Sequence, residues 1–149
     1  EHALATKLSQ SPFATQLFVA PGNGGTAVQF CNINLNLSDF EDVATAIAAN
    51  KIGLVVIGPE QPLVDGLVDF LENYPDSVVS EVPVVGPNQA CARLEGSKEF
   101  SKRVMESAGI PTAKSTYFVR SEWEKCQQYI ENHRLPVVIN EGPMHQPFQ

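Results

Sequence analysis

Short apolar runs alternate along the first half of the chain with longer stretches whose apolar positions recur at helical spacing. Apolar runs bounded by Gly, Pro or Asn predict buried strands, and the amphipathic stretches between them predict helices. This alternation is typical of βα units around a parallel sheet, so the expected fold class is α/β. The expected strands are 17–20, 33–37, 52–57 and 82–85, and the expected helices are 1–11, 38–50 and 62–73.

Two Ser-x-x-Glu segments have the spacing of a capping box. In this motif each side chain accepts a hydrogen bond from the backbone N–H of the other residue. Ser38 with Glu41 predicts the start of the helix that ends near Asn50, and Ser121 with Glu124 predicts the start of a later helix.

The pattern changes near Leu94, where two helical stretches, 89–94 and 97–107, follow each other without a strand between them. A helix stop and linker then covers 109–112. Further strands are expected over 115–119 and 136–139, on either side of a helix ending near 132. We therefore expect three parts, which are a first domain over 1–94, the beginning of a second over 95–140 and an atypical tail over 141–149.

The loop after the third expected strand is the clearest candidate for ligand binding. In open α/β sheets, small molecules bind beyond the carboxyl ends of the strands. Gly58 lets the chain turn there, and Pro59 and Pro62 fix the backbone so that Glu60 is held in a narrow set of directions. Since Gly and Pro also form ordinary turns between strands and helices, a purely structural role remains an alternative.

Composition narrows the choice of partners. A formal charge of −7 and a pI near 4.8 argue against a broad nucleic-acid surface, which needs a face rich in Lys and Arg. No apolar run approaches the ~20 residues that span a bilayer, so we expect a soluble, cytoplasmic protein without a membrane partner. Three widely spaced cysteines, Cys31, Cys91 and Cys126, indicate neither a disulfide framework nor a zinc site, and we expect buried free thiols.

Five segments, taken in order, resemble the N-terminal part of the phosphoribosylamine-glycine ligases (glycinamide ribonucleotide synthetases) of the ATP-grasp superfamily. Any one of them is weak evidence, but their combined order and spacing are specific, and the resemblance extends from the first residue to about Ile139. The segments are Glu1-His2-Ala3-Leu4, Val19-Ala20-Pro21-Gly22-Asn23-x-Gly25-Thr26-Ala27, Val56-Ile57-Gly58-Pro59-Glu60-x-Pro62-Leu63, Leu94-Glu95-Gly96-Ser97-Lys98-x-Phe100 and Gly109-Ile110-Pro111-Thr112-Ala113.

The resemblance implies a Rossmann-like domain followed by an incomplete ATP-grasp domain. It implies an ATP-dependent carbon-nitrogen ligase of purine biosynthesis, which joins 5-phosphoribosylamine to glycine through a glycyl phosphate, with Mg²⁺ or Mn²⁺ assisting in the complete enzyme. Such chemistry depends mainly on positioning, charge neutralisation and the exclusion of water. The family also implies fusion to other purine-pathway enzymes in many eukaryotes.

Carried over residue by residue, the resemblance assigns most candidate positions to the ribosylamine substrate. Glu60 is expected to accept hydrogen bonds from the ribose or amine, and Asn23 to give a supporting polar contact. Lys98 is expected to reach the ATP phosphates, and no catalytic or metal-binding residue is assigned. A frayed Glu1, solvated His2 and Lys98, and a turn-forming Asn23 are the structural alternatives. The expected substrate-binding residues are Glu1, Pro21, Gly22, Asn23, Gly25, Gly58, Pro59 and Glu60.

The sequence departs from the family at both ends. The family's first strand and its Gly-x-Gly-Gly-Arg loop would precede Glu1, and a lysine is expected where Asn140 stands. The segment 141–149, with His145, does not resemble the family's Gly-rich loop. We therefore expect a fragment that is inactive alone. The missing strand would lie between 17–20 and 52–57, which leaves two strand edges prone to aggregation. The alternatives are a fragment of another purine-pathway ATP-grasp enzyme, such as a carboxylase, and a noncatalytic sugar-phosphate-binding module.

Overall fold

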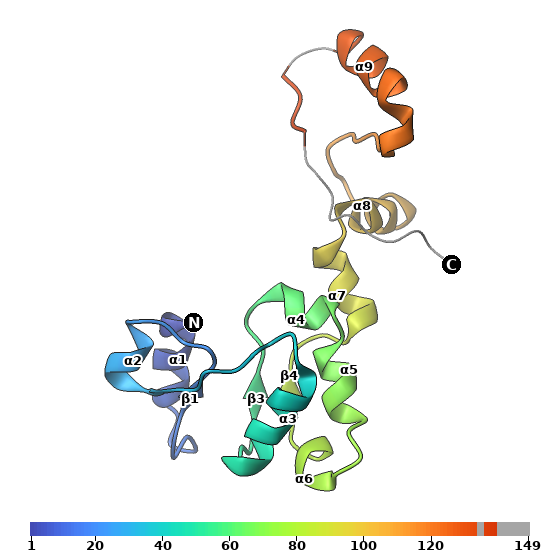
Figure 1. The fold of residues 1–149 in the computed structure, drawn as a ribbon. Coiled ribbons are helices and arrows are strands. Elements are labelled where there is room, and N and C mark those ends of the chain that lie inside the picture. Colours follow the sequence, from blue (N-terminus) through green and yellow to red (C-terminus); the bar gives the residue numbers. More distant parts are fainter. Residues whose placement is uncertain (134–135, 140–149) are drawn as a thin grey trace. The chain divides into compact units, whose positions relative to one another are not determined.

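A computed structural model describes residues 1–133 and 136–139 of the chain. Its contacts divide the chain into two compact units, residues 1–92 and 93–149, and each is described by itself (Figure 1). The boundary expected near Leu94 rests on the change in the pattern of helices and strands, and the assignment of 95–140 to an ATP-grasp domain stays a prediction.

The first unit contains two short parallel ladders. Strand β1 (Phe18–Val19) pairs with β2 (Cys31–Asn32), and β3 (Val55–Val56) pairs with β4 (Val84–Val85). Among the described residues, each strand has one neighbour, so the two pairs form separate two-stranded sheets. Parallel strands connected through helices confirm the α/β class.

Seven helices begin in this unit and cover the strands (Figure 1). The larger core lies where α3, α5 and α6 meet, and it buries Val43, Ile47, Leu71 and Val79 almost completely. These apolar side chains supply the main favourable term in folding. The helices are α1 (His2–Ser9), α2 (Thr26–Gln29), α3 (Phe40–Ala49), α4 (Glu60–Val64), α5 (Leu67–Glu72), α6 (Ser77–Ser80) and α7 (Gln89–Gly96), of which the last extends past the unit boundary.

Helix α3 begins one residue later than the capping box predicted. Asp39, not Ser38, is the N-cap residue, and its carboxylate accepts a bond from the Asp42 backbone N–H at 3.3 Å. Asp caps a helix as well as Ser does, so the Ser38-x-x-Glu41 pattern competed with an equally good neighbour. Glu41 instead accepts a 2.8 Å bond from the Tyr74 hydroxyl.

Four further expected elements in this unit need correction, and a helix was missed. The strand expected over 33–37 lies earlier, at Cys31–Asn32, and the strands within 52–57 and 82–85 are shorter than predicted. The helix expected over 62–73 is two helices, because Gly66 between them adopts a left-handed φ of +96°. Helix α6 was not predicted, although Asp76 caps it by accepting a bond from the Val78 N–H at 3.0 Å.

The second unit contains α8 (Lys98–Ser107), a 3-10 turn η1 (Arg120–Glu122) and α9 (Trp123–Glu131). Ser97 caps α8 by accepting a bond from the Phe100 N–H at 3.2 Å, and the helix expected over 97–107 is confirmed. The strands expected over 115–119 and 136–139 are wrong, since neither segment forms a ladder with another described residue. The predicted capping box at Ser121 is also wrong, because the helical turn already starts at Arg120 and Glu122 accepts the bond from the Val119 N–H.

The cysteines are free, as expected, but they are not buried. Cys31 and Cys91 are exposed and Cys126 is half-buried. Cys31 lies on a two-residue strand whose two side chains are both exposed, so a position in a strand did not imply a position in the core. None of the described helices is both long and apolar enough to cross a membrane.

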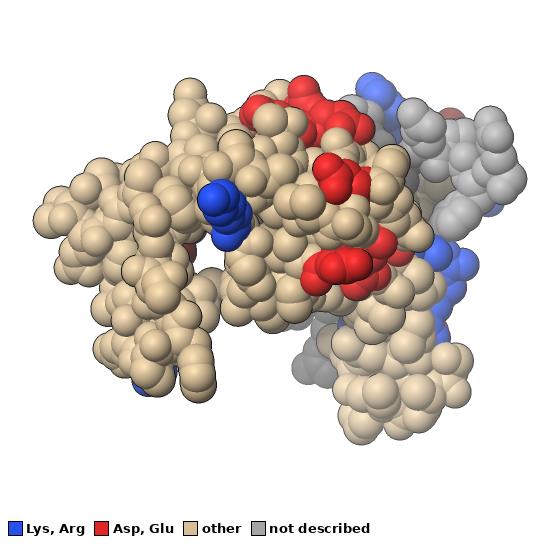
Figure 2. All heavy atoms as spheres, turned by 90° about the horizontal axis from the view of Figure 1, so that it is seen from below, with Lys and Arg blue, Asp and Glu red and all other residues tan. Residues whose placement is uncertain are grey.

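Acidic side chains gather over part of the surface drawn in Figure 2, as the net charge of −7 leads one to expect.

Candidate functional site

The loop after β1 is organised by the side chain of Asn23. Its Oδ1 accepts bonds from the backbone N–H groups of Gly25 at 2.9 Å and Thr26 at 3.2 Å, which closes the turn that starts α2. Its Nδ2 donates to the Glu1 carboxylate at 3.0 Å, across 22 residues of sequence. Both ends of the amide are thus engaged. Asn23 forms the turn, as its structural alternative states, and it also contacts a second candidate residue, Glu1.

Thr26 supports this loop from the interior. Its side chain is fully buried, and its hydroxyl both accepts from the Asn23 N–H at 2.7 Å and donates to the Asn23 carbonyl at 2.9 Å. The Asn32 side-chain amide donates to the same carbonyl at 3.1 Å. Sequence reasoning did not single out Thr26 or Asn32. An Asn followed three residues later by Thr is the signal that was available, because both side chains bond readily to nearby backbone.

The glycines of this loop allow neighbouring side chains to approach the backbone closely. Gly22 has a φ of +78°, and a Cβ there would overlap the Asn32 amide. A Cβ on Gly25 would lie 2.8 Å from the His2 Nδ1. Only glycine fits both the backbone conformation at the first position and the space at the second. Pro21 precedes them, on the surface, after a cis peptide bond from Ala20.

The first two residues of the chain lie against this loop. Glu1 is the N-cap residue of α1 and holds the Asn23 amide, so its side chain is not frayed. The His2 ring packs edge-on against Phe30 with a centroid separation of 6.4 Å and contacts Gly25. His2 is thus an exposed residue of α1 whose ring also packs against Phe30.

The loop after β3 leads directly into α4. Pro59 is the N-cap residue, and Glu60 is the first residue of the helix, with an exposed side chain. Gly58 approaches α1, since a Cβ there would lie 3.9 Å from the Leu4 side chain. The helix has five residues, and the rigid Pro59 sets the direction in which Glu60 leaves the sheet.

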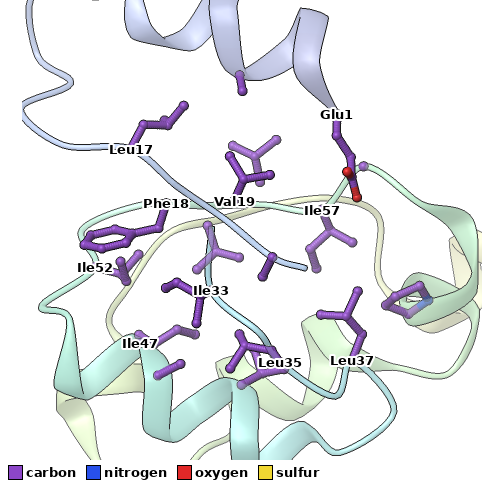
Figure 3. Close-up of a pocket in the computed structure, with 18 of the residues that line it drawn as sticks. Glu1, Leu17, Phe18, Val19, Ile33, Leu35, Leu37, Ile47, Ile52 and Ile57 are labelled. Carbon is purple, nitrogen blue, oxygen red and sulfur yellow. The ribbon is translucent and has the colours of Figure 1, made fainter. Parts of the chain in front are cut away.

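A cavity of about 530 Å³ lies between β1 and β3. Figure 3 shows apolar side chains gathered around it, with Leu17, Val19 and Ile57 beside it and Glu1 at its edge. It is lined almost wholly by aliphatic residues of both strands, of α1 and of α3. Gly58 and Pro59 also line it, so the candidate residues Glu1, Gly58 and Pro59 meet around one space.

The remaining candidates lie as follows. Asn23 is linked to this space by its bond to Glu1, while Gly25 and Glu60 are not among the described residues that line the cavity. Lys98 is exposed at the first turn of α8 in the second unit. Its contact with the ATP phosphates stays a prediction. Asn140 and His145 fall outside the described residues.

The described residues contain no group of three or more His, Cys, Asp or Glu side chains placed to hold a metal ion. Carboxylates, an amide and close-approaching glycines lie at the ends of the two strands, which is the place where open α/β sheets bind small molecules.

Residues 1–95 match the family described as "Phosphoribosylglycinamide synthetase, N domain". The chain is 42% identical over 139 residues to a phosphoribosylamine–glycine ligase of Rhizobium meliloti and 43% identical over 141 residues to that of Allochromatium vinosum, covering 93% of this chain and 31% of each of those proteins. It is 43% identical over 143 residues to the bifunctional purine biosynthetic protein PUR2,5 of Pichia angusta, covering 93% of this chain and 17% of that protein.

These proteins are much longer, and the chain spans about a third or less of each. The match nevertheless covers nearly all of the present sequence, including the loops after β1 and β3. The chain belongs to the phosphoribosylglycinamide synthetase N-domain family and corresponds to part of a phosphoribosylamine–glycine ligase.

Proposed function

We propose that this chain is the substrate-binding portion of a phosphoribosylamine–glycine ligase, an ATP-dependent enzyme that joins 5-phosphoribosylamine and glycine. Its first unit would be the Rossmann-like domain and its second unit the beginning of an ATP-grasp domain. The observation that carries the proposal is the bond between Asn23 and Glu1, which links the loop after β1 to the start of α1 beside the cavity.

In this proposal the carboxylates bind the substrate, and the Asn23 amide positions one of these carboxylates. Glu1 and Glu60 accept hydrogen bonds from ribose hydroxyls or the amine, because ionised carboxylates are acceptors only. Asn23, whose amide is already engaged at both ends, holds the Glu1 carboxylate in place instead of contacting substrate. Gly22, Gly25 and Gly58 let the substrate approach the backbone closely.

ATP would be bound by the complete ligase, with Lys98 as a contact to its phosphates. In that enzyme, a divalent cation and positive charges would stabilise the transferring phosphoryl group. The described residues do not fit a metal site, so no step through a metal is assigned to them. We accordingly propose that the chain alone does not catalyse ligation. The proposal includes fusion to a second purine-pathway activity, as in the bifunctional relative.

Substitution of Glu60 in a complete ligase that carries this segment tests the proposal. Glu60→Ala should lower kcat/KM for 5-phosphoribosylamine by ten-fold or more, equivalent to about 1.4 kcal/mol, while KM for ATP stays unchanged. Glu72→Ala is the matched control, because Glu72 is an exposed acid at the end of α5. Unchanged kinetics for Glu60→Ala would remove this carboxylate from the site.

A noncatalytic sugar-phosphate-binding module remains the second candidate, because the chain spans so small a share of its relatives. Binding of ribose 5-phosphate by a complete protein that carries this chain, without formation of ADP when 5-phosphoribosylamine, ATP and glycine are supplied, is the result that this alternative predicts and the ligase proposal does not.

A further inference from the structure

The loop after β1 has little apolar surface of its own to bury. Its residues 21–25 are one proline, three glycines and Asn23, so hydrogen bonds must supply most of what fixes its backbone. Two of these bonds meet at the Asn23 carbonyl, which accepts from the Thr26 hydroxyl at 2.9 Å and from the Asn32 side-chain amide at 3.1 Å. Thr26 follows the loop directly in sequence, whereas Asn32 reaches it from the neighbouring strand.

The position of Asn32 is set by the ladder between β1 and β2. Asn32 is the last residue of β2 and lies in register with Val19, the last residue of β1. The next residue, Ile33, donates its N–H to the Val19 carbonyl at 2.9 Å. The ladder thus brings the Asn32 side chain to the point where the loop leaves the sheet. A side chain held on a strand in this way is placed more precisely than one carried by a loop.

Gly22 and Asn32 fit against each other. Gly22 has a φ of +78°, and a Cβ on it would overlap Cγ, Oδ1 and Nδ2 of Asn32. The Asn32 amide therefore occupies the volume that a side chain at residue 22 would fill. This contact gives Gly22 a second requirement for glycine besides its backbone conformation. It also ties the loop to Asn32, a residue that none of the sequence motifs contains.

From the Asn23 carbonyl, the contacts continue to Glu1. The Asn23 side chain accepts from the N–H groups of Gly25 and Thr26 and donates to the Glu1 carboxylate at 3.0 Å. This side chain meets Glu1 only while the Asn23 backbone keeps its orientation. Because Asn32 fixes that orientation at the carbonyl, loss of its bond should loosen both the turn and the contact with Glu1.

We propose that Asn32 is a positioning residue of the site, which acts through Asn23 on the Glu1 carboxylate. In this role Asn32 does not contact the substrate. Its effect on substrate binding rests on the proposed function, in which Glu1 accepts hydrogen bonds from 5-phosphoribosylamine, but its effect on the loop does not. A carboxylate that binds the ground state and the transition state equally well affects KM and leaves kcat unchanged.

Two substitutions in a complete ligase that carries this chain separate the bond from the shape. Asn32→Leu keeps a branched, uncharged side chain over Gly22 but removes the donor, and Asn32→Ala removes both. Asn34→Leu is the matched control, because Asn34 is the next asparagine of the chain and is exposed. Amide hydrogen exchange is measured without ligand, and steady-state kinetics are measured for each substrate.

The exchange measurement tests the loop alone. The Gly25 and Thr26 amides donate to Asn23 Oδ1, so in Asn32→Leu they should exchange about ten-fold faster than in the wild type. Asn34→Leu should leave their exchange unchanged. Unchanged exchange of both amides in Asn32→Leu would overturn the inference.

The kinetics test the route through Glu1. Asn32→Leu should raise KM for 5-phosphoribosylamine about ten-fold, while kcat and KM for ATP stay within about two-fold. In a Glu1→Ala background, Asn32→Leu should cause no further rise, because the residue through which it acts is absent. Independent, multiplying effects of the two substitutions would overturn this route. If Glu1→Ala alone leaves KM unchanged, the proposed function fails, and the exchange measurement still decides the role of Asn32 in the loop.

The fit between Gly22 and Asn32 gives a check that needs no substrate. Gly22→Ala should lower the urea midpoint, and it should lower it less in an Asn32→Ala background, where the shorter side chain makes room for the new Cβ. Equal losses in both backgrounds would contradict the close contact on which the inference depends.

Discussion

At the scale of single residues, the buried hydroxyl of Thr26 supports the loop after β1 from the interior. It bonds to both the N–H and the carbonyl of Asn23, whose side chain then closes the turn and holds Glu1. A buried polar group that loses its partner costs more than the bond itself contributes. The position of the Glu1 carboxylate thus depends on the buried Thr26.

Replacement of Thr26 tests this dependence. Thr26→Val keeps the shape but leaves the Asn23 N–H and carbonyl without the hydroxyl, so the free energy of unfolding should fall by about 1–3 kcal/mol in urea titrations. Thr26→Ser keeps the hydroxyl and should cost less. Thr45→Val, on the exposed side of α3, is the control. Equal effects of Thr26→Val and Thr45→Val would contradict the role given to Thr26.

At the scale of elements, the sequence located most helices and strands of the first unit but placed their ends less well. The hydrophobic period identified α3, β3 and β4 because each packs in the larger core. It missed the break at Gly66, since an isolated glycine in a helical pattern does not reveal its φ. The strand expected over 115–119 failed for another reason, because an apolar run forms a strand only when a neighbouring strand pairs with it.

The break at Gly66 gives a prediction at this scale. Gly66→Ala puts a Cβ on a residue with a φ of +96° and within 3.3 Å of the Gln89 side chain, so it should lower the free energy of unfolding by about 1–2 kcal/mol. Gly53→Ala is the control, because Gly53 lacks both the positive φ and any near neighbour of its Cβ. Urea titration compares the two, and a neutral Gly66→Ala would mean that α4 and α5 merge into one helix.

The bond between Tyr74 and Glu41 ties the end of α5 to α3 in a pH-dependent way. The hydrogen bond to the Glu41 carboxylate raises the pKa of Tyr74 above its usual 10.0, with smaller contributions from desolvation and from nearby negative charge. A raised pKa means that the folded state favours the neutral phenol. The stabilisation is therefore fully present below pH 10 and is lost as the pH rises through the folded-state pKa.

Stability measured between about pH 9 and pH 11.5 checks this sign. The wild-type chain should lose stability over that range more steeply than Tyr74→Phe, which has no phenol to ionise. Tyr117→Phe, which replaces an exposed tyrosine of the second unit, is the matched control. Parallel slopes for the wild type and Tyr74→Phe would contradict the assignment.

At the scale of the whole molecule, the sequence offers candidate residues for a site but does not predict the contacts between them. The motifs pointed to the loops after β1 and β3 because carboxyl ends of parallel strands are where ligands bind. That Asn23 faces Glu1, and that an apolar groove separates the two ladders, depends on packing over long sequence separations. Sequence patterns encode local geometry far better than such contacts.

The central claim is that the loops after β1 and β3 serve one substrate. Amide hydrogen exchange of a complete ligase carrying this chain, with and without ribose 5-phosphate, tests it most directly. The account predicts that peptides covering 20–26 and 57–62 both exchange more slowly when the sugar phosphate is bound, while those covering 67–72 do not change. Protection of only one loop, or of neither at saturating ligand, would contradict the claim.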